Sequence, residues 1–369
     1  MVEPLGLYIH YPWCVKKCPY CDFNSHPLKS DVDQQAYLYA LETDWASQRR
    51  SEDHFSSVFF GGGTPSLFPP QHVAQLLDAL PVDRDAEITL EVNPGTQEHM
   101  SFHDYFAAGV NRLSIGAQSF NNHQLEVLGR IHQSREITNA FSNARAAGFT
   151  NINLDLMWGL PDQSLAAAMD DLEKAIELGP EHISWYQLTI EPKTEFAKRT
   201  PILPIEQTIY DTEQAGLERL ALAGFERYEI SAFAKVDKRC QHNLNYWQFG
   251  DYVGLGAGAH GKRAAVQSSS FSLTRSKKAS QPRLYLNKPE ATELYDVATE
   301  DITLEFMMNA LRLVDGVDWK IFEQRTGLPR ASIEVIWDRL VAQDLLQEWR
   351  CAPTAKGIRY LDSVLQHFM

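Results

Sequence analysis

The chain is poor in cysteine and contains no long hydrophobic run. Five cysteines among 369 residues argue against the disulfide framework of small secreted domains. No apolar run approaches the roughly 18 residues that a membrane-spanning helix needs. The N-terminal residues also lack the basic and apolar regions of a signal peptide. We therefore expect a cytoplasmic protein, and the sequence leaves its oligomeric state and any peripheral contact with a membrane open.

Positive charge is also scarce in this sequence. Lysine and arginine number 34 against 48 aspartates and glutamates, so the formal net charge is −14. Nucleic acids and anionic lipids attract basic surfaces, and this charge disfavours both as general partners. We expect no nucleic-acid partner. Hydrophobic residues make up 44% of the chain, which is enough for a large core and, at this length, about two domains.

Three of the cysteines lie close together, at Cys14, Cys18 and Cys21, in a CxxxCxxC pattern. Three thiolates within eight residues can bind three irons of a [4Fe-4S] cluster and leave the fourth iron free for a small molecule. A structural zinc site usually has four ligands in two separated pairs, and no second CxxC pair occurs in this sequence. His10 or His26 could supply a fourth ligand, so zinc remains the alternative.

Short β-branched or apolar runs alternate with amphipathic stretches through the first two thirds of the chain. The predicted strands are 7–10, 58–60, 88–92, 112–116, 152–157 and 183–189. The predicted helices are 32–49, 72–80, 102–108, 134–147, 164–178 and 206–223. Strands joined by helical connections of this length run parallel, which predicts an α/β barrel or part of one. Ligands bind at the carboxyl ends of such strands, and the cysteine loop follows the first strand.

Residues suited to ligand binding recur where the other predicted strands end. Gly61-Gly-Gly-Thr64-Pro65 follows the second strand, and glycines without a Cβ atom allow a close approach of the backbone to a ligand. Glu91, Gln118 and Asp155 lie within or just after the next three strands. Buried carboxylates are unfavourable without a partner, so they indicate recognition of hydrogen-bond donors. Each could equally cap a nearby loop, but their recurrence favours one ligand site.

Three motifs in this order resemble those of the radical S-adenosylmethionine (SAM) proteins, in the branch that is similar to coproporphyrinogen oxidase. They are CxxxCxxC, GGGTP and Asn153-Leu-Asp-Leu-Met-Trp-Gly-Leu-Pro161, and the resemblance covers nearly the whole chain. It implies a partial (β/α)6 barrel of the TIM type, a [4Fe-4S] cluster on the three cysteines, and bound SAM. The positions that match SAM contacts of the family are Tyr8, Tyr20, Gly62, Gly63, Thr64, Glu91, Gln118, Arg130 and Asp155.

Two features separate this chain from the oxidases of that branch. The oxidases have a fourth cysteine two positions after the third, where this chain has Phe23, and a long segment before the first cysteine, where this chain has thirteen residues. The run His242-Asn-Leu-Asn-Tyr246-Trp247 resembles the HNxxYW motif of the heme chaperones. The resemblance implies His242 as an axial ligand of heme, with His260 as a second candidate.

The implied function is therefore a heme chaperone that binds heme and passes it to an acceptor protein, expected to be a heme protein of the respiratory chain. On this interpretation no residue is catalytic. The alternative is an enzyme of the same scaffold that acts on coproporphyrinogen III or another tetrapyrrole. The two differ in outcome, because an enzyme alters the tetrapyrrole whereas a chaperone moves unchanged heme.

The rest of the chain suggests two further units. We expect a barrel over 1–235, a connecting region with the heme motif over 236–294, and a C-terminal domain over 295–369. Residues 256–261 match GxGxxG, but the following helix and the acidic residue of a dinucleotide site are missing. We interpret this tract as a close backbone approach and the polar stretch 262–288 as a linker or a connection that carries loops.

The C-terminal domain is predicted to be helical. Its expected helices are 303–312, 318–326 and 330–343, and segments 345–349 and 351–354 are expected to form a small hairpin. This order resembles a winged helix. The segment carries several acids and no concentrated basic helix, so we expect it to pack or dock against a partner and not to read DNA.

Overall fold

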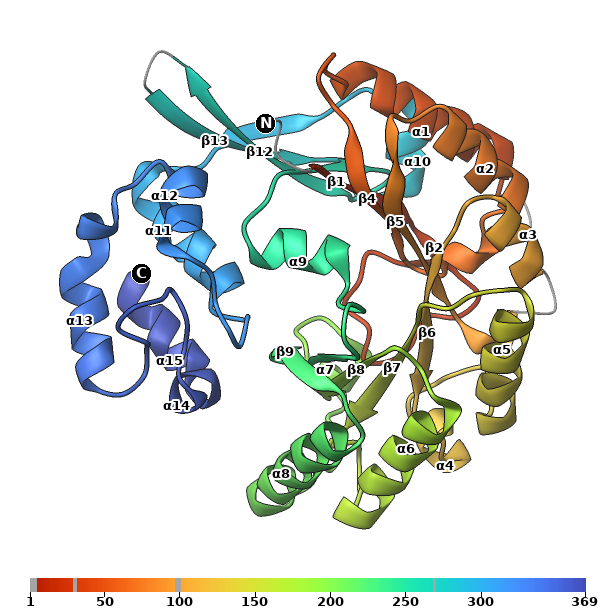
Figure 1. The fold of residues 1–369 in the computed structure, drawn as a ribbon. Helices are drawn as coiled ribbons and strands as arrows, with labels where there is room; N and C mark the ends of the chain where they lie inside the picture. The colour runs from red at the N-terminus through yellow and green to blue at the C-terminus, as the bar shows by residue number, and fades with distance from the viewer. Residues whose placement is uncertain (1–4, 29–31, 97–100, 268–269) are drawn as a thin grey trace.

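The computed structural model describes residues 5–28, 32–96, 101–267 and 270–369. Within these residues the main sheet has twelve strands in the order β14-β13-β12-β11-β1-β4-β5-β6-β7-β8-β10-β9. Seven consecutive members of this order, β11 (Tyr252–Leu255) to β8, run parallel, and the six from β1 to β8 curve into a partial barrel (Figure 1). These six are β1 (Leu5–Tyr11), β4 (Phe55–Gly62), β5 (Val82–Val92), β6 (Arg112–Gln118), β7 (Ile152–Trp158) and β8 (His182–Gln187). The predicted partial barrel with a mostly parallel core is confirmed.

Helices cover the outer face of these strands, as Figure 1 shows along the right side and bottom of the view. They are α1 (Gln34–Gln48), α2 (Pro70–Asp78), α3 (Phe102–Ala107), α4 (Asn122–Val127), α5 (Ser134–Ala146), α6 (Leu165–Leu178) and α8 (Glu206–Leu222). The short helix α7 (Glu195–Lys198) instead lies against the cysteine loop, where the N–H of Phe196 donates to the carbonyl of Pro19 at 3.0 Å. Short 3₁₀ helices occupy 65–67 and 94–96, and β2 (Trp13–Cys14) pairs with β3 (His26–Pro27) beside the cysteine loop. The strands run parallel because each crossover returns the chain to the same end of the sheet, and the crossover helices bury their apolar sides on it.

The strands present different side chains to the two faces of the barrel. On β6, Leu113 and Ile115 are fully buried in the apolar layer beneath the helices. Arg112 and Ser114 occupy the alternate positions and face the barrel interior, where they meet side chains of neighbouring strands. The same alternation on β5, β7 and β8 makes the interior polar. This polar interior, and not an apolar one, holds the candidate site.

The stretch 262–288 is not a linker, which corrects the sequence prediction. It contains most of β12 (His260–Gln267), β13 (Ser270–Lys277) and α10 (Pro282–Asn287). These follow β11 (Tyr252–Leu255), which pairs in parallel with β1, and the antiparallel edge continues to β14 (Glu293–Asp296). The polar composition is misleading because two of its lysines are buried as ion-pair partners, Lys262 with Asp251 and Lys278 with Asp44. At the other end of the sheet lie β10 (Ala232–Ala234) and β9 (Glu226–Glu229).

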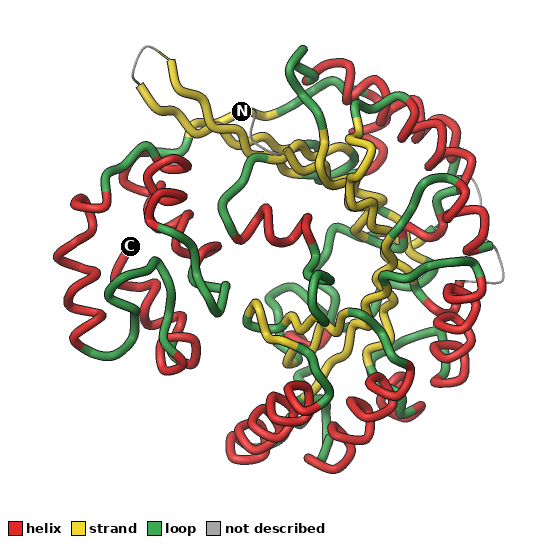
Figure 2. Tube along the Cα trace, viewed as in Figure 1, coloured by secondary structure: helices red, strands yellow, loops and turns green. Residues whose placement is uncertain are grey.

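Helix α9 (Gln241–Trp247) lies on the open side of the partial barrel, between the two ends of the sheet (Figures 1 and 2). The C-terminal domain packs on the other side of α9, around a second apolar core that includes Phe249 and Phe306. Its helices are α11 (Thr299–Ala310), α12 (Trp319–Thr326), α13 (Glu334–Ala342), α14 (Ala355–Arg359) and α15 (Leu361–Leu365), with 3₁₀ turns at 330–333 and 366–368. The expected hairpin is reduced to an isolated bridge between Leu346 and Pro353.

Among the helices of the described residues, none combines the length and the apolar character needed to cross a membrane.

The buried ion pair between Lys278 and Asp44 provides a test of this fold. Asp44 also accepts from the Tyr285 hydroxyl at 2.8 Å and from the backbone N–H of Gly256 at 3.2 Å, so it joins α1 to the 256–288 segment. Replacing Lys278 with methionine leaves an unpaired buried carboxylate, and we expect a loss of about 3 kcal/mol in the free energy of unfolding. Chemical denaturation measures it.

The exposed pair of Lys198 with Glu195 serves as the control, and Lys198→Ala should cost less than about 1 kcal/mol. If Lys278→Met were as mild as this control, the 256–288 segment would contribute little to the stability of the barrel.

Candidate functional site

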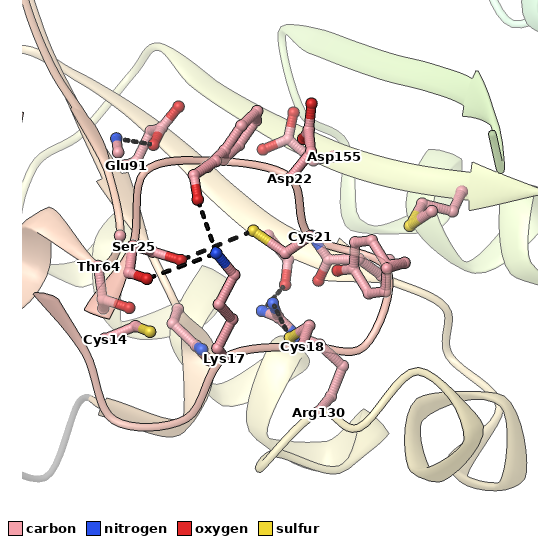
Figure 3. A pocket seen from close by; sticks show the side chains of 18 of the residues that line it. Cys14, Lys17, Cys18, Cys21, Asp22, Ser25, Thr64, Glu91, Arg130 and Asp155 are labelled. Carbon is pink, nitrogen blue, oxygen red and sulfur yellow. Dashed lines mark hydrogen bonds between the residues drawn. The ribbon is translucent and has the colours of Figure 1, made fainter. Parts of the chain in front are cut away.

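A pocket of about 430 Å³ opens at the carboxyl ends of the parallel strands. Its wall comes from the cysteine loop after β1, the Gly62–Pro65 turn after β4, and the ends of β5 to β8. A volume of this size is typical of sites for small organic ligands. Figure 3 shows how side chains from these separate strands point into the same space.

All three cysteines of the CxxxCxxC pattern line this pocket. Cys14 belongs to β2, and a turn brings the backbone N–H of Cys21 to the carbonyl of Cys18 at 3.2 Å. Arg130 Nη1 donates to the sulfur of Cys18 at 3.7 Å, and Lys17 Nζ donates to the carbonyl of Phe23 at 2.9 Å (Figure 3). The loop thus presents three thiols to one cavity and leaves the side toward β5 to β8 free for a ligand.

The two histidines that could complete a zinc site are engaged elsewhere. Both ring nitrogens of His10 have partners, the Tyr8 hydroxyl at 2.9 Å and the carbonyl of Asn24 at 2.8 Å. His26 Nε2 lies 3.2 Å from Asn24 Oδ1. Among the described residues, no group of three or more His, Cys, Asp or Glu side chains is arranged to hold a single metal ion. In this arrangement neither histidine is free to act as the fourth ligand of a zinc site.

The glycine-rich tract 256–261 supports the cysteine loop. A Cβ atom on Gly258 would lie 2.3 Å from Asn24 Nδ2, and one on Gly256 would lie 2.4 Å from the carbonyl oxygen of His10. Asn24 Nδ2 donates to the carbonyls of Ala257 and Ser280, at 2.9 Å each. The predicted close backbone approach is confirmed, and its role is to hold the segment that follows Cys21.

The glycines after β4 also pack against the cysteine loop. A Cβ atom on Gly63 would lie 2.4 Å from the carbonyl oxygen of Trp13, and one on Gly62 would lie 2.7 Å from His10 Cε1. Their N–H groups are used inside the protein: that of Gly62 donates to Glu91 Oε2 at 3.1 Å, and that of Gly63 donates to the carbonyl of Tyr11 at 2.7 Å. The absent side chains thus bring β4 and the loop together, and Thr64 completes this part of the pocket wall.

Two acids, Glu91 and Asp155, line the pocket from β5 and β7. Burial and the nearby carboxyl of Asp155 raise the pKa of Glu91 to about 8. Burial also raises the pKa of Asp155, although Ser114 Oγ and Asn153 Nδ2 each donate to it at 2.8 Å. Two buried acids that resist ionisation form a site that a cationic, hydrogen-bond-donating ligand would stabilise.

Gln118 and Arg130 complete the wall on the side of β6. Gln118 adopts a left-handed backbone conformation with φ of 61°, and its buried Oε1 atom lacks a hydrogen-bond partner within the described residues. An unpartnered buried carbonyl and a strained backbone occur together at ligand sites. Arg130 Nη2 donates to the carbonyl of Gly116 at 3.1 Å, which holds the guanidinium at the pocket.

The two predicted tyrosines differ in position. Tyr20 lines the pocket, where burial raises its pKa. Tyr8 lies deeper on β1, outside the pocket wall, and its hydroxyl meets His10 Nδ1. Eight of the nine predicted SAM positions therefore lie on one wall. Sequence reasoning missed Tyr186 and Met157, which also line the pocket; they occupy alternate positions after Ser184 and Asp155, and this period of two was the available signal.

His242, the predicted heme ligand, does not lie at this pocket. It is on α9, only 1% exposed, with the Ser57 hydroxyl at 3.0 Å from Nδ1 and the Tyr246 hydroxyl at 3.0 Å from Nε2. Burial, with a smaller contribution from Arg112, lowers its pKa to about 3. Both nitrogens are occupied, so this conformation does not fit heme ligation by His242, and that role stays a prediction. His260 is exposed at the start of β12.

Comparison with known proteins agrees with this arrangement. Residues 8–175 match the radical SAM superfamily, and residues 297–333 match the HemN C-terminal domain. Coproporphyrinogen III oxidase (HemN) from Escherichia coli superposes with a TM-score of 0.80 over 99% of this chain and 90% of that chain. Its sequence identity is 24%, so this likeness establishes the shared fold.

Several relatives found by sequence are more similar to this chain than that oxidase is. The heme chaperone HemW of Haemophilus influenzae is 45% identical over 100% of this chain and 98% of its own length. HemW of Escherichia coli is 46% identical over 100% and 99%, and HemW of Bacillus subtilis is 34% identical over 87% and 86%. With similarity along the entire length, and with cysteines, glycines and acids gathered at the mouth of a partial barrel, the chain belongs to the HemW family of heme chaperones within the radical SAM superfamily.

Proposed function

We propose that this protein is a heme chaperone that binds heme and transfers it to an acceptor protein, expected to be a heme protein of the respiratory chain. The observation that carries the proposal is the identity of 45% and 46% to two heme chaperones over the full length of the chain. The loop sequence adds support, because Phe23 replaces the fourth cysteine that the oxidases are expected to have and its side chain lines the pocket.

The pocket is proposed to hold a [4Fe-4S] cluster and SAM, which the radical SAM domain implies. Cys14, Cys18 and Cys21 would hold three irons, and the open side of the pocket would admit SAM beside the fourth. A bound and reduced cluster would be able to supply an electron to SAM. Glu91 would face the cationic methionine end, Asp155 would accept from a ribose hydroxyl, and Arg130 would meet a carboxylate. The unpartnered Oε1 of Gln118 would accept from a donor of the ligand.

The decisive experiment separates a chaperone from an oxidase. The protein is reconstituted anaerobically and given SAM, reductant and either coproporphyrinogen III or heme, and the tetrapyrroles are followed by chromatography and absorption. We expect unchanged coproporphyrinogen III and stoichiometric capture of heme, followed by release to an acceptor apoprotein. Catalytic decarboxylation of coproporphyrinogen III would overturn the proposal.

Removing a thiol tests the cluster assignment. Cys18→Ser leaves one iron without its protein ligand, and we expect the variant to lose most of its iron and sulfide after anaerobic reconstitution. Cys351→Ser is the matched control, because Cys351 is buried in the C-terminal core against Met307. Iron and sulfide analysis with electron paramagnetic resonance gives the readout. Equal cluster content in both variants would contradict the assignment.

The raised pKa of Glu91 predicts how SAM binding depends on pH. Its carboxyl is protonated below about pH 8 and faces Asp155, the Tyr8 hydroxyl and the Gly62 N–H group. A cationic ligand favours the ionised form, so binding releases a proton. Affinity should therefore rise with pH, by at most about tenfold per unit for one proton, and level off once Glu91 is already ionised.

Calorimetric titration of SAM in the absence of reductant measures this profile. Glu91→Gln should bind more weakly at alkaline pH and show a flatter profile, and the comparison removes the contribution of the ligand's own amino group. Glu195→Gln, at an exposed surface carboxylate, should leave the profile unchanged. A profile of the same slope in Glu91→Gln would show that another group releases the proton.

The buried state of His242 predicts opposite effects for two neighbouring substitutions. If His242 ligates heme after α9 moves, His242→Ala should lose the Soret shift of bound heme. Tyr246→Phe removes the partner of Nε2 without changing the shape of the side chain, and heme should then associate faster. Stopped-flow absorption measures both. An unchanged Soret spectrum and stoichiometry in His242→Ala would place the heme on another residue.

A further inference from the structure

A line of hydrogen bonds connects Asp155 in the pocket with the start of α9. Asn153 Nδ2 donates to Asp155 Oδ1 at 2.8 Å, and Asn153 Oδ1 lies 2.6 Å from His182 Nδ1. On the other side of the ring, His182 Nε2 lies 2.8 Å from the Tyr228 hydroxyl. That hydroxyl accepts the backbone N–H of Cys240, the residue before α9, at 3.3 Å. The line crosses β7, β8 and β9, which are far apart in sequence.

The donors of this line all point toward Asp155. The Cys240 N–H can only donate, so it leaves the Tyr228 hydrogen free to donate to His182 Nε2. A neutral imidazole that accepts at one nitrogen donates at the other, and His182 Nδ1–H then meets the amide oxygen of Asn153. Burial keeps His182 neutral by lowering its pKa far below the usual value. These partners determine the tautomer of His182 and the orientation of the Asn153 amide. The same assignment results whether it starts from the Cys240 N–H or from the Asn153 amide group that donates to Asp155.

The intermediate groups are closed off from solvent. Asn153 is 2% exposed, His182 and Tyr228 are 1% exposed each, and Cys240 is fully buried. In such a low-dielectric interior, aligned hydrogen bonds polarise and strengthen one another. We therefore expect a change in charge or bonding at Asp155 to alter the strength of the bond at Cys240.

A second contact joins the same two places. Glu87 Oε1 accepts the backbone N–H groups of Gln241 at 2.9 Å and His242 at 3.2 Å, in the first turn of α9. Its other oxygen lies 3.8 Å from Nε of the buried Arg112. Both Glu87 and Asp155 act electrostatically on that guanidinium. Arg112 is therefore within electrostatic reach of both the acid of the pocket and the acid that holds α9.

We propose that His182 and Tyr228 are positioning residues that transmit occupancy of the pocket to α9, the helix that carries His242. The inference rests on the proposed function, because SAM is taken as the ligand that reaches Asp155. A ligand hydroxyl that donates to Asp155 stabilises its ionised form, and an ionised carboxylate is a stronger acceptor for Asn153. The strengthened line holds the first turn of α9 more firmly, so SAM controls how readily His242 becomes available.

Hydrogen–deuterium exchange of the cluster-reconstituted protein, without reductant, tests this. Uptake into 241–247 is compared with and without saturating SAM. In the wild-type protein we expect SAM to slow exchange of these amides by about fivefold or more. In Tyr228→Phe, which removes only the bridging hydroxyl, the ratio should fall close to one. His182→Phe breaks the line of hydrogen bonds at the next position, and its ratio should also fall close to one.

Ser57→Ala is the matched control, because Ser57 bonds His242 directly and takes no part in the line. It should change uptake in both states and keep the ratio. A purely structural role for Tyr228 would likewise change uptake in both states without affecting the ratio, so the ratio is the informative quantity. SAM affinity is measured on the same samples.

The outcomes separate the two proposals. Wild-type protein that does not bind SAM would overturn the assignment of SAM to this pocket, and this inference with it. SAM binding without protection of 241–247 would overturn only the inference. Protection that persists in both Tyr228→Phe and His182→Phe would do the same, because occupancy would then reach α9 without these residues.

Discussion

Buried polar side chains inside the partial barrel need partners from the protein or from a ligand, and the rest of the structure depends on this constraint. Leaving a buried polar group without a partner costs about 1 to 3 kcal/mol, and a buried charge costs more. Arg112 is matched by Glu87, while Asp155 is matched by Ser114 and Asn153. Parallel strands with alternating side chains allow this pairing, because the intervening positions still supply the apolar layer beneath the helices.

The same constraint explains how the open side of the barrel is closed. The parallel strands do not complete a ring, and an open interior would leave Glu87 and Ser57 in contact with water. Helix α9 fills this gap, with its first N–H groups on Glu87 and with His242 on Ser57. The C-terminal domain then packs on α9 through contacts such as Arg312 over the ring of Trp247 at 4.5 Å. The heme motif is thus part of the packing that closes the barrel.

Some features were readable from the sequence and others were not. The spacing of Cys14, Cys18 and Cys21 and the acids at strand ends predicted one site, and eight of nine predicted positions lie on its wall. The prediction of a linker over 262–288 was wrong because lysines in a polar stretch suggest exposure to solvent, whereas two of these lysines are buried. The glycines at the end of β4 were expected to let the backbone approach a ligand. Their amides bond within the protein, and it is their missing Cβ atoms that matter.

The sequence by itself determined the elements and the ligand-bearing positions, because strand alternation, helical periodicity and cysteine spacing are local properties of the chain. It also carried the resemblance that pointed to the family. Only the tertiary structure decided which partners these positions have. His242 reads as an available ligand in the sequence, yet Ser57 on β4 occupies one of its nitrogens, 185 residues away. Pairings across such separations depend on how the strands are arranged in the sheet, and no local pattern encodes them.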